Sequence, residues 1–300
     1  MINEDIKTKI INLSLMPIGT ILPIGQTEDD GFLIRSSGYF GLAIPIEENI
    51  KVDDTFVGMY MNTDILNYHD KHINVLHLFV KDSADLIKFS YVGESFFAKE
   101  NRKILNVNPY KWIDEWKDLF GDSLKRMKVY DVIGELLSLK MVFSKDSTAK
   151  WLGPESGTYD IVTSTGCIEV KSTVKKVEKE IVIHGARQLS KNENELLYFC
   201  RLEPRPHAHT INSIAIELIT LGYNEEELEA LLKKVGYPKG RKERENSFDL
   251  VCVHSYCVNN DNFPIISLKD INQFGNFNNI IDYTLTLDLS TLPYEVVYEK

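Results

Sequence analysis

Two carboxylates and a lysine stand close together in the middle of the chain, in a spacing that could support chemistry on a phosphate. Alternate side chains of a β-strand share a face, so Glu169 and Lys171 point the same way. If a turn centres on Ser164 and Thr165, antiparallel pairing places Asp160 opposite Glu169. The sequence therefore predicts a hairpin that carries two acids and one ammonium group on one face.

Such a cluster is unfavourable by itself, because crowded carboxylates repel one another and lose hydration unless a cation joins them. Mg²⁺ would relieve the repulsion, since it prefers oxygen ligands and commonly takes one or two carboxylates together with water and phosphate oxygens. A lysine beside the ion can hold a water molecule or neutralise charge that develops on phosphorus. Asp160, Glu169 and Lys171 together favour metal-assisted hydrolysis of a phosphodiester.

This arrangement resembles the PD-(D/E)XK nuclease superfamily, in which an Asp on one strand and a Glu-x-Lys on the next form the active site. Asp160 matches the Asp of the motif, Glu169 the second acid and Lys171 the lysine. The Pro-Asp pair of the motif is not adjacent here, because Tyr159 precedes Asp160 and the nearest proline is Pro154. Proline is no metal ligand, so the difference leaves the expected geometry intact.

The resemblance implies further site residues. Glu135 looks like the acid that family members contribute from the preceding helix, and Gln188 like a glutamine that supports the site from the helix after the lysine strand. The implied cofactor is Mg²⁺, for which Mn²⁺ can substitute. The implied ligands are Asp160, Glu169 and the carbonyl of Val170, while Glu135 would orient a metal-bound water or hold a second ion.

Several other runs look like those of a bacterial family of PD-(D/E)XK motif proteins found in restriction and phage-defence loci. They are Trp151–Pro154, Arg187–Leu189, Phe263–Pro264 and Ile281–Leu285. The resemblance implies a Mg²⁺-dependent DNA endonuclease, either a type II-like restriction enzyme or the nuclease subunit of a restriction or defence system. Double-stranded DNA would be its substrate, and other subunits of such a system its partners. Cutting both strands usually takes two sites, which favours a homodimer.

Two alternatives stay open. One is a non-catalytic DNA-binding or assembly subunit with the same fold, and the other is a repair or recombination nuclease that reads DNA structure.

The elements around the motif alternate between helices and strands. Apolar spacing predicts a helix over 129–143 and, further on, helices over 186–191, 209–221 and 224–235. Strands are expected over 158–163, 167–173, 181–184, 195–200, 248–253 and 282–288. This order predicts an α/β or mixed α+β fold, and the resemblance implies a restriction-endonuclease-like core of a mixed β-sheet flanked by helices.

The first part of the chain is instead rich in predicted strands, at 31–35, 39–45, 55–61 and 74–80. A short helical turn over 82–88 and a helix over 110–120 complete it. Gly121–Ser123 could end that helix and begin the next segment. We therefore expect a strand-rich domain over 1–122, for recognition or dimerisation, and a nuclease domain over 123–300.

Composition narrows the class of protein. The chain has 300 residues, a net charge of -10, and no apolar run of membrane-spanning length, which excludes an integral membrane protein. The net charge disfavours broad attraction to nucleic acid, but residues 170–191 carry a local excess of basic side chains. No signal peptide is recognisable, and the four cysteines form no C-x-x-C pair, so we expect a cytoplasmic protein with reduced thiols.

Overall fold

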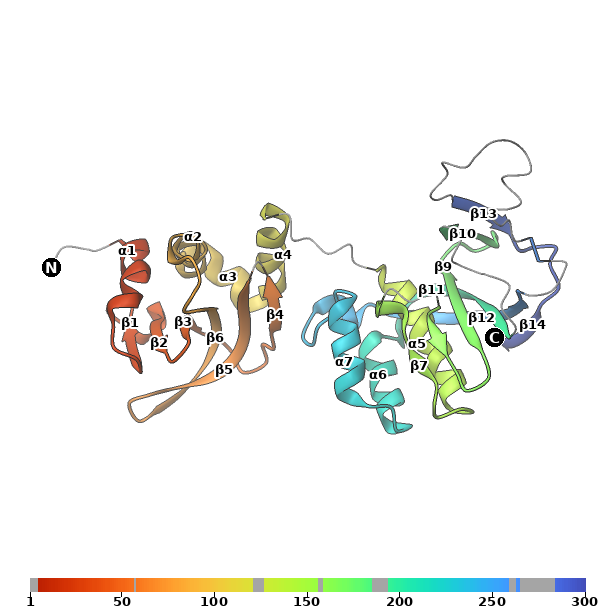
Figure 1. Cartoon of the computed structure of the whole chain (residues 1–300), viewed down its shortest axis with the longest axis horizontal. Helices are drawn as coiled ribbons and strands as arrows, with labels where there is room; N and C mark the ends of the chain where they lie inside the picture. Colours follow the sequence, from red (N-terminus) through yellow and green to blue (C-terminus); the bar gives the residue numbers. More distant parts are fainter. Residues whose placement is uncertain are drawn as a thin grey trace. The chain divides into compact units, whose positions relative to one another are not determined.

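The computed structural model shows two compact units (Figure 1). It describes residues 5–56, 58–120, 127–155, 159–184, 194–258, 263–264 and 284–300. The first unit comprises residues 1–125 together with 237–242, and the second comprises residues 126–236 and 243–300. The predicted boundary between residues 122 and 123 falls in a stretch outside the described residues. Among the described helices, none is both long enough and apolar enough to cross a membrane.

The first unit contains a six-stranded antiparallel sheet in the order β1-β2-β3-β6-β5-β4. Its strands are β1 (Thr20–Pro23), β2 (Phe32–Ser36), β3 (Tyr39–Pro45), β4 (Asp53–Phe56), β5 (Met59–Tyr68) and β6 (Lys71–Lys81). Its helices are α1 (Ile6–Ile11), α2 (Leu86–Phe97), α3 (Lys99–Val107) and α4 (Pro109–Leu119), with short 3-10 turns at Asn12–Leu15 and Glu28–Asp30.

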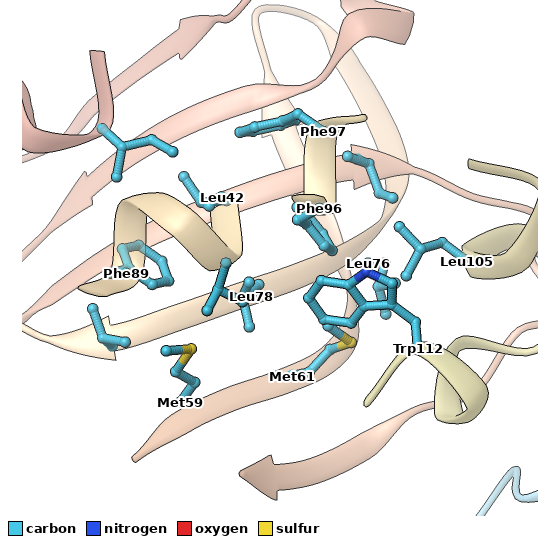
Figure 2. Packing of buried hydrophobic residues seen from close by; sticks show 14 of the residues in the cluster. Leu42, Met59, Met61, Leu76, Leu78, Phe89, Phe96, Phe97, Leu105 and Trp112 are labelled. Carbon is cyan, nitrogen blue, oxygen red and sulfur yellow. The ribbon is translucent and has the colours of Figure 1, made fainter. Parts of the chain in front are cut away.

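The core of this unit lies between the sheet and the helices. Figure 2 shows apolar side chains of β3, β5 and β6 packed against those of α2, α3 and α4. The strands supply alternate residues such as Met59 and Met61, which share one face of β5. A smaller apolar cluster, to which Leu66 and Tyr68 of β5 contribute, lies on the other face of the sheet. The helical turn expected at 82–88 is in fact the full helix α2, which begins after Asp85. The Asp85 side chain accepts hydrogen bonds from the first backbone N–H groups and thereby caps the helix.

His77 on β6 gives this unit a pH-dependent stability. Burial lowers the pKa of His77 to about 4, and the nearby Asp64 offsets only part of that effect. The unfolded chain therefore takes up the proton more readily, so stability is full above the ordinary pKa of 6.5 and is lost as pH falls toward 4. We expect His77 to contribute a loss of about 3 kcal/mol across this window in the wild type, and the loss to be smaller in His77→Gln.

Urea unfolding at pH 7.5, 5.5 and 4.5, followed by tryptophan fluorescence in a Trp151→Phe background, would measure this difference, because Trp112 and Trp116 both belong to this unit. His72→Gln is the matched control, because His72 lies exposed on the same strand. Equal pH dependence of the wild type and His77→Gln would contradict the expectation.

The second unit is built on a mixed six-stranded sheet in the order β14-β12-β11-β9-β8-β7. Its strands are β7 (Lys150–Trp151), β8 (Ile161–Val162), β9 (Cys167–Thr173), β11 (Glu195–His209), β12 (Phe248–Cys257) and β14 (Glu295–Glu299). A two-stranded sheet pairs β10 (Glu180–His184) with β13 (Thr284–Asp288). The helices are α5 (Val129–Phe143), α6 (Ile211–Thr220) and α7 (Glu225–Lys234), with 3-10 turns at Gly153–Glu155 and Lys242–Glu245.

Only β9 and β11 run parallel among the paired strands described in this sheet, and the other pairs are antiparallel. The mixed α+β class is thus confirmed. Most predicted elements lie where the sequence places them, although the helix expected at 186–191 falls outside the described residues. The strand expected at 195–200 is longer than predicted, because β11 continues to His209.

Helix α5 packs closely against β9 and β11 (Figure 1). The close approach depends on Gly134, since a Cβ there would stand 2.0 Å from the Ser172 hydroxyl of β9. The buried Ser138 hydroxyl lies 3.3 Å from the Cys200 thiol of β11 and links the helix to the sheet. This packing fixes α5 on the sheet and brings Glu135, the next residue after Gly134, toward the hairpin strands.

Candidate active site

The hairpin of β8 and β9 has the register that the turn at residues 164–165 predicts. Ile161 pairs with Ile168, and the backbone N–H of Asp160 donates to the carbonyl of Ile168 at 3.1 Å. That bond is offset by one residue from the Ile161–Ile168 register, so the expected pair of Asp160 with Glu169 is not part of the described ladder. The regular strand β8 is short, however, and Asp160 lies just before its first residue.

Two contacts fix the charged groups of the hairpin. The carboxylate of Asp160 accepts a hydrogen bond of 2.7 Å from the backbone N–H of Val170. The Lys171 ammonium lies 2.7 Å from a carboxylate oxygen of Glu169, whose side chain is nearly fully buried. The structure therefore brings Asp160, Glu169 and Lys171 into one cluster.

Glu135 joins this cluster from helix α5. Its side chain is 4% exposed, and its Oε2 accepts a hydrogen bond of 2.7 Å from the indole N–H of Trp151, which is fully buried. Gly153 lies between the two acids: a Cβ added there would stand 2.7 Å from Glu135 Oε2 and 2.9 Å from Asp160 Oδ1. The two carboxylate oxygens are thus separated by no more than the sum of these distances, and a side chain would fill the space between them.

The crowding of acids changes their proton affinity. Burial raises the pKa of Asp160 to about 7, and the negative charge of Glu169 contributes to the rise. Burial and the charge of Asp160 raise the pKa of Glu135 well above its ordinary range. Burial also raises the pKa of Glu169, against the lowering effect of Lys171. These groups repel one another, as expected where a cation would bind.

The surroundings of Lys171, unlike those of the acids, favour its charged form. Burial by itself would lower the pKa of Lys171, but the ion pair with Glu169 and the charges of Asp160 and Glu135 raise the net value. The ammonium therefore stays protonated and supplies a fixed positive charge and hydrogen-bond donors to the site.

A fourth acid, Asp131, lies near this cluster. Burial raises its pKa to about 6, while the positive charges of Lys128 and Lys171 act to lower it. Sequence reasoning assigned it no role, although its position four residues before Glu135 places both acids on neighbouring turns of α5. This i,i+4 spacing is the feature of the sequence that could have linked Asp131 to the site of Glu135.

The donor set fits a hard divalent cation. Two carboxylates, Glu135 and Asp160, approach each other where Gly153 has no side chain, and Mg²⁺ needs only one or two carboxylates because water fills its other positions. In the described part of the chain, no three His, Cys, Asp or Glu side chains form a ready-made metal cluster. The carbonyl of Val170 and the ligand roles of Asp160, Glu169 and Glu135 thus stay predictions. Gln188 lies outside the described residues.

Comparison with known protein families supports the resemblance of Asp160, Glu169 and Lys171 to the PD-(D/E)XK motif. A family model described as "Putative PD-(D/E)XK family member, (DUF4420)" matches residues 92–290, which is about two thirds of the chain. No curated protein and no solved structure matches the sequence. Because the match covers the charged hairpin, helix α5 and most of the mixed sheet, the chain belongs to the DUF4420 family of PD-(D/E)XK-like proteins.

Proposed function

We propose that this protein is a Mg²⁺-dependent DNA endonuclease. The observation that carries the proposal is that Glu135 and Asp160 meet at Gly153 and that Asp160, Glu169 and Lys171 interact within the same hairpin. Buried acids that raise one another's pKa are a poor structural solution without a cation. The same groups suit a site that binds a metal ion and a phosphate.

Each residue has a distinct role in this proposal. Asp160 and Glu169 bind the ion, with Mn²⁺ as a substitute for Mg²⁺, and Glu135 orients a water molecule near them. The bound ion would supply Lewis-acid stabilisation of the phosphate and a more acidic water. Lys171, held protonated by its ion pair, donates hydrogen bonds to the attacking water or to the phosphate oxygens. The fixed cluster positions water and phosphate without any covalent intermediate.

The loop that follows β9, which we propose lies near DNA, carries less net positive charge than its lysines alone suggest. Lys175 forms ion pairs with Glu178 and Glu180, so part of the local positive charge is neutralised within the protein. Lys176 is exposed on the same loop and is available to a phosphate backbone. We propose double-stranded DNA as the substrate, bound locally near β9 and not through the charge of the whole protein.

The biological setting follows from the resemblance to proteins of restriction and phage-defence loci. In that setting the protein is a type II-like restriction enzyme or a nuclease subunit, acts in the cytoplasm as a homodimer or with other subunits, and uses the strand-rich first unit for recognition or dimerisation. A non-catalytic subunit of the same fold would lack metal binding. A structure-specific nuclease would cut branched or single-stranded DNA in preference to linear duplex.

Cleavage of unmodified and modified plasmid and phage DNA, with Mg²⁺ or Mn²⁺, tests the proposal. We expect metal-dependent cutting by the wild type and a loss of at least about 10²-fold in Lys171→Ala, because the variant lacks the fixed charge at the phosphate. Asp160→Ala should lose both cutting and metal binding. Lys145→Ala, which changes an exposed lysine just after α5, is the control and should keep its cleavage rate within a few-fold.

Two outcomes would decide against the proposal. A folded wild type that binds neither Mg²⁺ nor Mn²⁺ indicates a non-catalytic subunit. Cutting that survives in both Lys171→Ala and Asp160→Ala indicates a different active site or a contaminant.

A further inference from the structure

The short segment Trp151–Gly153 fastens together the two elements that carry Asp160 and Glu135. The backbone N–H groups of Leu152 and Gly153 both donate to the carbonyl of Asp160, at 2.7 and 3.2 Å. Trp151 pairs with Ile161 in the sheet. The main chain of this segment is therefore fixed to the strand that Asp160 precedes.

The side chain of Trp151 reaches from that segment to helix α5. Its indole N–H donates to Glu135 Oε2 at 2.7 Å, a distance expected for a hydrogen bond to a charged acceptor. The backbone N–H of Trp151 donates to the Tyr223 hydroxyl at 3.2 Å, which ties it to the turn between α6 and α7. Trp151 is fully buried, so the indole has no freedom to follow Glu135 if that carboxylate moves.

The chemistry of this contact is well suited to orienting an anion. Indole is a donor only, and it neither gains nor loses a proton in the ordinary pH range. Unlike a lysine or arginine, it brings no full positive charge that would compete with a cation for Glu135.

We infer that Trp151 is a positioning residue for metal binding: its indole N–H holds the Glu135 carboxylate beside Asp160, where both acids approach Gly153. The inference rests on the proposed function, because it assigns a purpose to Glu135 that only a metal-binding site requires. Residues that orient ligands through one hydrogen bond typically change metal affinity by about 10- to 100-fold when they are replaced.

Calorimetric titration with Mn²⁺ and with Mg²⁺, in the absence of DNA, tests the inference in four proteins: wild type, Trp151→Phe, Glu135→Gln and the double variant. Phenylalanine keeps an aromatic ring but removes the N–H. We expect Trp151→Phe to weaken metal binding about 10- to 100-fold, and to weaken it no further when Glu135 is already glutamine. Trp116→Phe, an equivalent change on α4 of the first unit, should leave metal affinity unchanged.

The indole N–H resonances give a second readout that is independent of activity. The chain has three tryptophans, and two of them, Trp112 and Trp116, belong to the first unit. We expect addition of Mg²⁺ to shift the Trp151 indole resonance and to leave the other two in place. The shift should disappear in Glu135→Gln.

The possible failures are distinguishable. Metal binding of unchanged affinity in Trp151→Phe overturns the inference and leaves the proposed function intact. The inference is also overturned if Trp151→Phe weakens metal binding equally whether residue 135 is glutamate or glutamine, because such a loss reflects a general structural effect. A wild-type protein that binds no metal overturns the proposed function, and the inference with it.

Discussion

Asp160→Asn is expected to abolish cleavage while making the metal-free protein more stable. Asparagine keeps the size of the side chain and an oxygen that can accept the backbone N–H of Val170, but it removes the charge. Loss of a charged metal ligand should lower the cleavage rate by at least about 10²- to 10³-fold. The same loss relieves the repulsion from Glu169 and the cost of burying an ionised acid, which together hold the pKa of Asp160 near 7.

The size of the stabilisation depends on pH, and its sign follows from the direction of the pKa shift. The folded protein binds the Asp160 proton more tightly than the unfolded chain, whose ordinary pKa is 3.8. The charged group therefore destabilises the fold as pH rises from about 4 to 7, and the penalty is full above pH 7. One pKa unit corresponds to about 1.4 kcal/mol, so we expect Asp160→Asn to gain about 2–4 kcal/mol at pH 8 and almost nothing at pH 4.

Urea unfolding of the metal-free proteins at both pH values measures this gain. Asp249→Asn is the control of opposite sign, because Asp249 is a half-buried acid that accepts hydrogen bonds from Lys300 and Arg205, which lower its pKa. That variant should be no more stable than the wild type. A destabilised Asp160→Asn at pH 8 would show that the carboxylate serves the fold and not a cation.

The charged hairpin could be predicted from sequence because its geometry depends on local rules. Alternation along a strand puts Glu169 and Lys171 on one face, and a turn at a known position fixes which residue lies opposite. Both rules need only a few neighbouring residues. The register of Ile161 with Ile168 follows from them.

The contact between Trp151 and Glu135 could not be predicted in the same way. It joins a strand to a helix, and it depends on how closely α5 approaches the sheet at Gly134. No periodicity in the sequence encodes that distance. From the sequence, Trp151 was therefore noted only within the family-like run Trp151–Pro154 and was assigned no role at the site.

Some helices and strands whose apolar residues show little periodicity were also missed from the sequence, and another strand was predicted too short. Strand β14 lies at the sheet edge and is largely exposed, so it lacks the alternation that marks a half-buried strand. Helix α3 buries only Leu105 fully, which leaves little apolar periodicity to detect. Strand β11 continues through Pro204 and Pro206, which indicated a loop but are accommodated near an irregularity in the pairing with β12.

Gly153→Ala tests whether the gap between the acids is essential. The added methyl group would stand 2.7 Å from Glu135 Oε2 and 2.9 Å from Asp160 Oδ1, closer than a carbon and an oxygen can approach without a shift. Neither acid can retreat easily, because Trp151 holds Glu135 and the N–H of Val170 holds Asp160. We expect a loss of about 1–3 kcal/mol in stability and a much larger effect on metal binding and cleavage, of at least about 10²-fold.

A substitution at another glycine of the same unit distinguishes the loss of stability from the loss of metal binding and cleavage. Gly222 adopts a positive φ of 103° with no neighbouring atom within reach of a Cβ, so Gly222→Ala should cost about 1 kcal/mol through backbone strain alone. Metal titration and cleavage assays on both variants, at a temperature where each is folded, make the comparison. If Gly153→Ala and Gly222→Ala lose stability alike and both keep metal binding and cleavage, the gap at Gly153 is not where the cation and water are held. If only Gly153→Ala loses them, the space between Glu135 and Asp160 is the centre of the site.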